Sequence, residues 1–207
     1  MSVDVFSDTI LAAAATSEAD QVQAELMALR AQVASLQSER AALWWENNHD
    51  DLTGLANRRM LINVGPSLLS SGGRCAVAVL DLNGFKPIND QWGHAIGDDV
   101  LRTVARRLSH CLGDDLAVRL SGDEFAAILT ESSLPGHGCD WSSRVGAIAA
   151  AIAEPMVIDG RELRVTASIG VATTSDGPAA IAELLRRADL AMYRAKADRY
   201  CSNIVWD

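Results

Sequence analysis

The chain has 207 residues, 49% of them hydrophobic, which is enough for one domain with a sizeable core plus an appended segment. Its formal net charge of −9 argues against the basic face by which proteins bind nucleic acid regardless of sequence. Four cysteines lie far apart without metal-ligand spacing, which is typical of reduced thiols. The apolar run at 10–15 is too short to span a membrane, and no Lys or Arg precedes Arg30. We therefore expect a soluble, cytoplasmic protein.

Residues 18–49 contain neither Gly nor Pro, and apolar side chains recur in alternating steps of four and three residues. The members of this stripe are Val22, Leu26, Leu29, Val33, Leu36 and Leu43, with Arg40 in one slot. The pattern is typical of a coiled coil, and the alternative is an amphipathic helix packed on its own domain. Because the opposite face is polar, we favour a coiled-coil stalk over 18–49. Residues 1–17 are too few for a sensory domain, and we interpret them as a tail that docks an unidentified partner.

Beyond residue 50 the apolar spacing alternates between helical and strand periods. It predicts helices at 57–70, 98–111, 141–153 and 178–195. Strands are expected at 75–80, in a hairpin over 116–129, in a second hairpin whose arms, 156–158 and 163–172, flank Asp159-Gly160, and at 203–206. This order predicts an α+β (mixed α/β) sandwich, in which helices pack on a central, mainly antiparallel sheet.

Two adjacent carboxylates, Asp123 and Glu124, follow Gly122 at the tip of the first expected hairpin. Adjacent carboxylates repel each other and favour solvent, so the arrangement makes sense where a cation lies between them. Upstream, Asp81 ends the apolar run 76–80. Acids at the ends of neighbouring strands supply the oxygen ligands that Mg²⁺ prefers. The alternative is a solvated acidic turn.

Five sequence blocks between residue 50 and about residue 200 carry a further signal. They are residues 50–59 (DDLTGLANRR), 81–98 (DLNGFKPINDQWGHAIGD), 121–125 (SGDEF), 165–170 (VTASIG) and 188–196 (ADLAMYRAK). The ordered set resembles the GGDEF-domain diguanylate cyclases, with Ser121 in place of the first glycine of the name motif. The resemblance implies a polymerase-palm-like GGDEF domain over 50–207.

The resemblance also implies a bacterial signalling enzyme that condenses two GTP molecules into cyclic di-GMP and releases two pyrophosphates. Each 3′-hydroxyl attacks the α-phosphate of the other nucleotide, so the protein must hold metal, align the attack and neutralise charge. Since one domain holds one GTP, a homodimer is implied, and the coiled coil would join it. The metal, Mg²⁺ or Mn²⁺, would be held by Asp81, Asp123, Glu124 and the backbone carbonyl of Leu82. Glu124 would alternatively receive the proton of the attacking hydroxyl.

Six further residues match positions that bind substrate in the family. The triphosphate would be contacted by two lysines and by the motif loop, and the guanine edge would be read by an amide and a carboxylate: Lys86, Lys196, Ser121, Gly122, Asn89 and Asp98. The lysines could equally be ordinary surface residues. The Asn89 and Asp98 pair could instead cap helices.

Three departures from the family pattern bear on activity. A Cβ at Ser121 costs about 1 kcal/mol if that position requires a positive φ, and little otherwise. After Lys196 the run 197–201 lacks the usual glycine, and Arg199 stands one position early. At the family's product-inhibition site Leu112 replaces the arginine, so we expect Asp115 to face an anionic ligand alone and repel it.

Two alternatives to an active enzyme follow from these departures. The domain could be catalytically silent and bind GTP or cyclic di-GMP as a signalling module. It could also be a coiled-coil scaffold with a vestigial domain, but that leaves the set of matched site residues unexplained.

Overall fold

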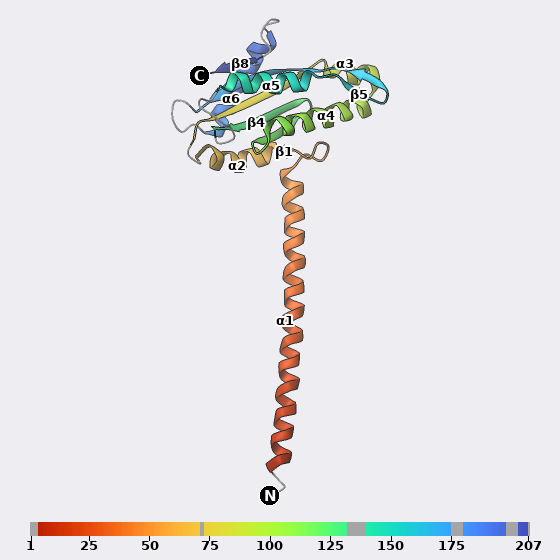
Figure 1. The fold of residues 1–207 in the computed structure, drawn as a ribbon, viewed down its shortest axis with the longest axis vertical. Helices are drawn as coiled ribbons and strands as arrows, with labels where there is room; N and C mark the ends of the chain where they lie inside the picture. The colour runs from red at the N-terminus through yellow and green to blue at the C-terminus, as the bar shows by residue number, and fades with distance from the viewer. Residues whose placement is uncertain (1–3, 71–72, 132–139, 175–179, 198–202, 207) are drawn as a thin grey trace. The chain divides into compact units, whose positions relative to one another are not determined.

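The computed structural model (Figure 1) describes residues 4–70, 73–131, 140–174, 180–197 and 203–206, with backbone only over 4–20 and 203–206. Residues 1–45 and 46–207 form two compact units. Helix α1 (Asp4–Asn48) begins in the first unit, and its last residues, 46–48, belong to the second, so the chain is already helical at Asp4. No helix in the described ranges combines the length and the apolar character that crossing a membrane requires.

The apolar stripe of α1 is exposed in the single chain. Its six side chains are between 45% (Leu26) and 60% (Val22) exposed. Most helical stability in proteins comes from packing of an apolar face, so this exposed stripe suits contact with another helix.

The second unit is built on a six-stranded sheet in the order β1-β3-β4-β2-β7-β8. The strands are β1 (Ala56–Asn57), β2 (Cys75–Asn83), β3 (Leu116–Ser121), β4 (Glu124–Thr130), β7 (Thr166–Thr173) and β8 (Asn203–Trp206). The three central pairings, β3 with β4, β4 with β2 and β2 with β7, are antiparallel, and the two edge pairings are parallel. The predicted α+β class with a mainly antiparallel sheet is confirmed.

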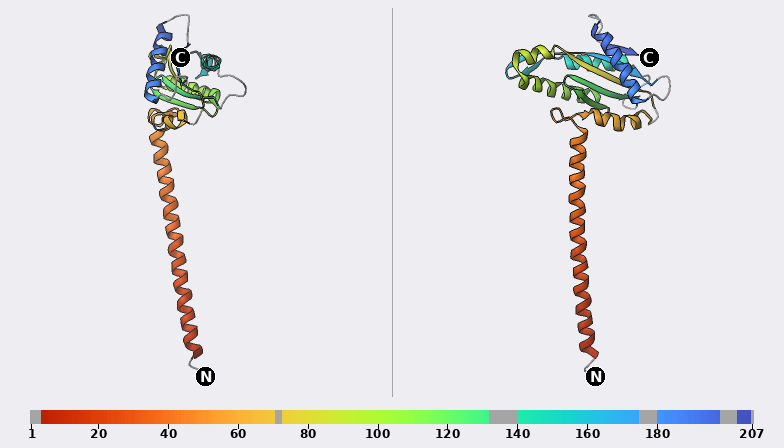
Figure 2. Two further views of the ribbon diagram at one scale, coloured as in Figure 1. Left: turned by 90° about the vertical axis from the view of Figure 1, so that its left-hand side faces the viewer. Right: turned by 180° about the vertical axis from the view of Figure 1, so that it is seen from behind.

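Helices cover both faces of this sheet (Figure 2). One layer contains α2 (Arg58–Ser70) and α6 (Ile181–Ala197), and the other contains α3 (Phe85–Trp92), α4 (His94–Leu112) and α5 (Trp141–Ala153). Successive side chains of a strand point to opposite faces. Accordingly Val77 and Val79 of β2 belong to the core beneath α2 and α6, whereas Ala78 and Leu80 belong to the core beneath α4 and α5.

The second hairpin differs from the prediction. Its arms are the short strands β5 (Met156–Ile158) and β6 (Arg161–Leu163), which form a separate two-stranded sheet around Asp159-Gly160. The single long strand expected over 163–172 is therefore wrong at its start, because β7 begins at Thr166 and pairs with β2 along eight residues. Pairing with the central strand buries the apolar run of β7 on both faces, which pairing with an exposed hairpin arm would not do.

Glycine at position 170 allows α6 to lie directly on β7. A Cβ at Gly170 would come within 2.1 Å of both the Ala188 carbonyl oxygen and the Met192 amide nitrogen. These are backbone atoms of α6, so the close approach requires a residue without a side chain. This contact fixes the course of the helix that carries Lys196.

Candidate active site

A row of polar residues crosses β3, β4, β2 and β7 at one end of the sheet. Ser121 pairs with Glu124, Glu124 with Asp81, and Asp81 with Ser168. Directly paired residues of antiparallel strands project from the same face of a sheet. Asp81 follows Val79 by two residues, so this face is the one beneath α6. The fold therefore places the carboxylates of Asp81 and Glu124 side by side.

The tip of the β3–β4 hairpin has its left-handed residue at the second motif position. Gly122 has φ +47°. Among the described residues, Asp159 is the one non-glycine residue with a positive φ, so Ser121 has a negative φ. Ser121 therefore has an ordinary backbone conformation, and its Cβ carries no left-handed penalty. The Leu82 amide donates to the Asp123 carbonyl oxygen at 3.2 Å, which fastens the tip to the end of β2.

Lys196 of α6 forms an ion pair with Asp81. Its Nζ lies 2.7 Å from Asp81 Oδ1, and the side chains are 49% and 13% exposed, respectively. The ammonium thus neutralises the Asp81 carboxylate. It is the cation that the described residues place against Asp81.

The oxygen donors at this corner fit a magnesium ion in chemical type. Mg²⁺ in nucleotide sites is bound by one or two carboxylates together with substrate phosphates. Asp81 and Glu124 supply two neighbouring carboxylates, and Leu82 and Asp123 lie beside them. Over the described ranges, no three His, Cys, Asp or Glu side chains gather closely enough to hold a metal by themselves. Water molecules, or phosphate oxygens when a nucleotide is bound, would complete the coordination.

A second cluster lies where α3 meets α4. A Cβ at Gly97 would lie 1.8 Å from Asn89 Oδ1, so the absence of a side chain there makes room for the amide. Asn89 Oδ1 is buried and has no hydrogen-bond partner in the described part of the chain. A buried acceptor without a partner costs about 1–3 kcal/mol, which a ligand that donates to it would recover. Asp98 follows Gly97 directly, and Lys86 lies exposed near the start of α3.

The expectation that Asp115 faces a ligand is wrong. Asp115 is 8% exposed, and its carboxylate forms an ion pair with Arg144. Its Oδ1 also accepts hydrogen bonds from the Thr130 amide at 3.0 Å and the Thr130 hydroxyl at 2.8 Å. Leu112, at the position of the family's arginine, belongs to the core. Asp115 therefore ties the start of β3 to the end of β4, and its charge is already neutralised.

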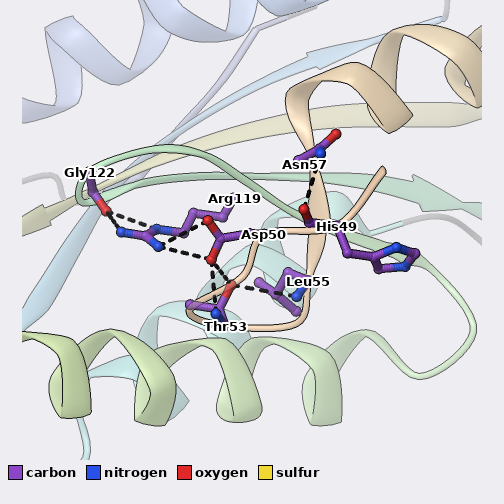
Figure 3. Close-up of polar contacts among 7 residues, drawn as sticks. All are labelled: His49, Asp50, Thr53, Leu55, Asn57, Arg119 and Gly122. Carbon is purple, nitrogen blue, oxygen red and sulfur yellow. Dashed lines mark hydrogen bonds and ion pairs between the residues drawn. The ribbon is translucent and has the colours of Figure 1, made fainter. Parts of the chain in front are cut away.

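Residues outside the predicted site hold the hairpin tip from the other face (Figure 3). Arg119 Nε and Nη2 donate to the Gly122 carbonyl oxygen at 3.0 and 2.9 Å, and Nη1 donates to Asp50 Oδ1 at 2.8 Å. Asp50 Oδ1 also accepts from the Thr53 amide at 2.9 Å and the Thr53 hydroxyl at 2.6 Å. Burial raises the pKa of Asp50, but the hydrogen bonds from Thr53 and Arg119 outweigh it and bring the pKa below its ordinary value of 3.8.

The sequence contained a partial signal for this network. Asp50 and Thr53 have the spacing of an aspartate that caps its own turn, and Arg119 stands two residues before the acidic motif. Arg199, whose role was in question, lies outside the described residues.

Known proteins resemble this chain over the region that contains these features. Residues 47–200 match the family model described as diguanylate cyclase, GGDEF domain. An uncharacterized protein of Mycobacterium tuberculosis is 38% identical over 183 residues, which are 84% of this chain and 29% of that protein. The diguanylate cyclase TpbB of Pseudomonas aeruginosa is 37% identical over 169 residues, 79% of this chain and 38% of that protein.

Among solved structures, the coiled coil and GGDEF domain of DgcB from Caulobacter crescentus, in complex with c-di-GMP, aligns with a TM-score of 0.75. The identity is 25%, and the alignment covers 89% of this chain and 99% of that chain. The present chain belongs to the GGDEF-domain family. It spans 29% of the length of the mycobacterial relatives that it matches.

Proposed function

We propose that this protein is a diguanylate cyclase that condenses two GTP molecules into cyclic di-GMP and two pyrophosphates in a Mg²⁺-dependent reaction. The observation that carries the proposal is the direct pairing of Asp81 with Glu124, with Lys196 against Asp81. Two neighbouring carboxylates, with a lysine paired to one of them, suit the binding of a metal–triphosphate.

Each residue of the corner has a role in this proposal. Asp81, Glu124, Asp123 and the Leu82 carbonyl would hold the metal, which when bound neutralises charge that develops on the phosphates. Lys196 would then exchange Asp81 for a phosphate oxygen, and Lys86 and the backbone of Ser121 and Gly122 would contact the triphosphate. A metal held by Asp81 would neutralise that carboxylate, and the Lys196 ammonium would then be available to a phosphate oxygen.

Base recognition would belong to the second cluster. The Asn89 amide would satisfy O6 and N7 of guanine, and the Asp98 carboxylate would accept from the N1–H and 2-amino group. A base without those donors would leave the Asp98 carboxylate unpaired, which discriminates strongly against it.

Catalysis would require two domains, since each 3′-hydroxyl attacks the nucleotide of the other. We propose that the stalk at 18–49 forms a parallel coiled-coil dimer and raises the effective concentration of facing domains. The DgcB structure, with its coiled coil and GGDEF domain, supports this arrangement. Residues 1–17 would dock a partner, and the protein would act in the cytoplasm of a bacterial cell.

A catalytically silent receptor for GTP or cyclic di-GMP is the second candidate. The run 197–201, which lacks the family's glycine and displaces Arg199, favours it. In either case Leu112 offers no donor to an anionic ligand, so we propose that inhibition through the family's product site is absent.

Incubation of the purified protein with GTP and Mg²⁺ tests the proposal, with products identified by mass spectrometry. The proposal requires cyclic di-GMP and pyrophosphate. Bound GTP without product at high protein concentration would support the receptor instead.

A further inference from the structure

A hydrogen bond joins the first and fourth residues of the acidic motif. Ser121 Oγ donates to Glu124 Oε2 at 3.0 Å. The two residues are paired across the hairpin, and a register shift between Arg119 and Ser121 brings them opposite each other. A glycine at position 121 has no side chain and cannot make this bond.

The bond acts on a carboxylate that has a like charge beside it. Glu124 is flanked by Ser121 on β3 and by Asp81 on β2. Like charges directly opposite each other in a sheet repel. The Ser121 hydroxyl on the β3 side fixes one oxygen of Glu124, while Lys196 of α6 holds one oxygen of Asp81. Each carboxylate is thus held by its own partner, Ser121 or Lys196.

The second oxygen of Glu124 stays available. Within the described residues, Glu124 Oε1 makes no hydrogen bond. A monodentate metal ligand needs one available oxygen. Because the hydrogen bond to the other oxygen already limits the rotamers of Glu124, the side chain loses less conformational entropy when it binds a metal.

We propose that Ser121 is a positioning residue that holds Glu124 for a divalent cation shared with Asp81. The catalytic consequence rests on the proposed cyclase function, but the effect on cation binding does not. On this account Ser121 compensates for the glycine it replaces, and a hydroxyl at position 121 is the feature that matters.

Mn²⁺ alone, titrated into the full chain and followed by EPR of the free ion, tests this directly. Ser121→Ala and Ser121→Gly should weaken Mn²⁺ binding roughly threefold to tenfold, less than the full effect of a hydrogen bond to a charged group because the site is partly exposed. Ser121→Thr, which keeps the hydroxyl on an ordinary strand backbone, should restore binding to within about twofold. Ser109→Ala, which removes the hydroxyl of an exposed serine on α4, should change nothing.

Equal Mn²⁺ affinity in Ser121→Ala and wild type would overturn the proposal, as would a threonine variant as weak as the alanine variant. Absence of Mn²⁺ binding by the wild type would overturn it too. Product formation from GTP is measured on the same variants. If the wild type makes no cyclic di-GMP but the Mn²⁺ series follows the expected order, the proposed function fails and the role of Ser121 stands.

Discussion

Arg119 and Asp50 are 69 residues apart in the chain, yet Arg119 Nη1 lies 2.8 Å from Asp50 Oδ1 and 3.1 Å from Oδ2. The side chains are 12% and 24% exposed, so water screens the pair less than it screens a surface ion pair. Arg119 also binds the Gly122 carbonyl oxygen through Nε and Nη2. Asp50 therefore fixes the arginine that fixes the motif loop.

Asp50→Asn should lower the free energy of unfolding by about 1–2 kcal/mol at neutral pH, because it removes a partly buried charge partner of Arg119. Because folding lowers the pKa of Asp50, the Asp50 charge stabilises the folded state above pH 3.8, and this stabilisation is lost as the pH falls below that value. Urea unfolding from pH 7 to pH 3 measures the difference from wild type, which should shrink at the acid end.

Asp99→Asn is the matched control for Asp50→Asn. Asp99 forms an ion pair with Arg102, and the two side chains are 52% and 48% exposed, respectively. Loss of this pair should lower the free energy of unfolding by less than about 1 kcal/mol. If both variants lose the same free energy of unfolding, the Asp50–Arg119 pair stabilises the fold no more than an exposed ion pair does.

Gly97→Ala should weaken GTP binding about tenfold while changing the free energy of unfolding by less than about 1 kcal/mol. The new Cβ would lie 1.8 Å from Asn89 Oδ1, and the amide can rotate away but then leaves its recognition position. Isothermal titration with GTP measures the affinity. Gly146→Ala on α5, which meets no atom within 4 Å, should leave affinity unchanged and add about 0.5–1 kcal/mol of stability. Unaltered GTP affinity in Gly97→Ala would remove Asn89 from the binding site.

Gly170→Ala should destabilise the domain by about 3 kcal/mol or more, since overlap with fixed backbone atoms cannot be relieved by a side-chain rotation. The Cβ would lie 2.1 Å from backbone atoms of both Ala188 and Met192, so α6 would have to shift and take Lys196 with it. The midpoint of urea unfolding reports the loss. A midpoint equal to that of wild type would show that α6 does not lie on β7 as described.

Leu29→Asn combined with Leu36→Asn should convert a dimer into a monomer in sedimentation velocity. Both side chains belong to the exposed stripe, at 58% and 57% exposure, and an amide at two seam positions removes apolar burial. Met27→Asn is the control, because Met27 is 68% exposed but lies off the stripe. A double variant that sediments as a dimer would place the dimer interface elsewhere.

Local patterns predicted the fold class because each strand alternates between two cores. The continuous apolar run 75–80 predicted a strand buried on both faces, and in the structure Val77 and Val79 face α2 and α6 while Ala78 faces the other layer. The boundary between β6 and β7 could not be predicted in this way. Leu163 and Val165 extend the apolar run of β7 toward β6, and the point at which β7 begins depends on the burial available beside β2.

The acidic corner of the site could be predicted from the sequence, because acids end two separate apolar runs. Asp81 and Glu124 were expected to lie near each other on that ground, and their direct pairing follows from the strand order. The burial of Asp115 depends on Arg144, 29 residues away, and the role of Arg119 depends on Asp50. Contacts at such separations leave no periodic trace in a single sequence.

Product formation by Asp81→Asn tests the central claim most directly. The amide keeps the shape of the carboxylate but removes the charge that would hold Mg²⁺ beside Glu124. We predict that wild type converts GTP and Mg²⁺ into cyclic di-GMP, and that Asp81→Asn loses this activity by at least about a thousandfold while it stays folded and retains its oligomeric state. Cyclic di-GMP formation by Asp81→Asn at the wild-type rate would contradict the account.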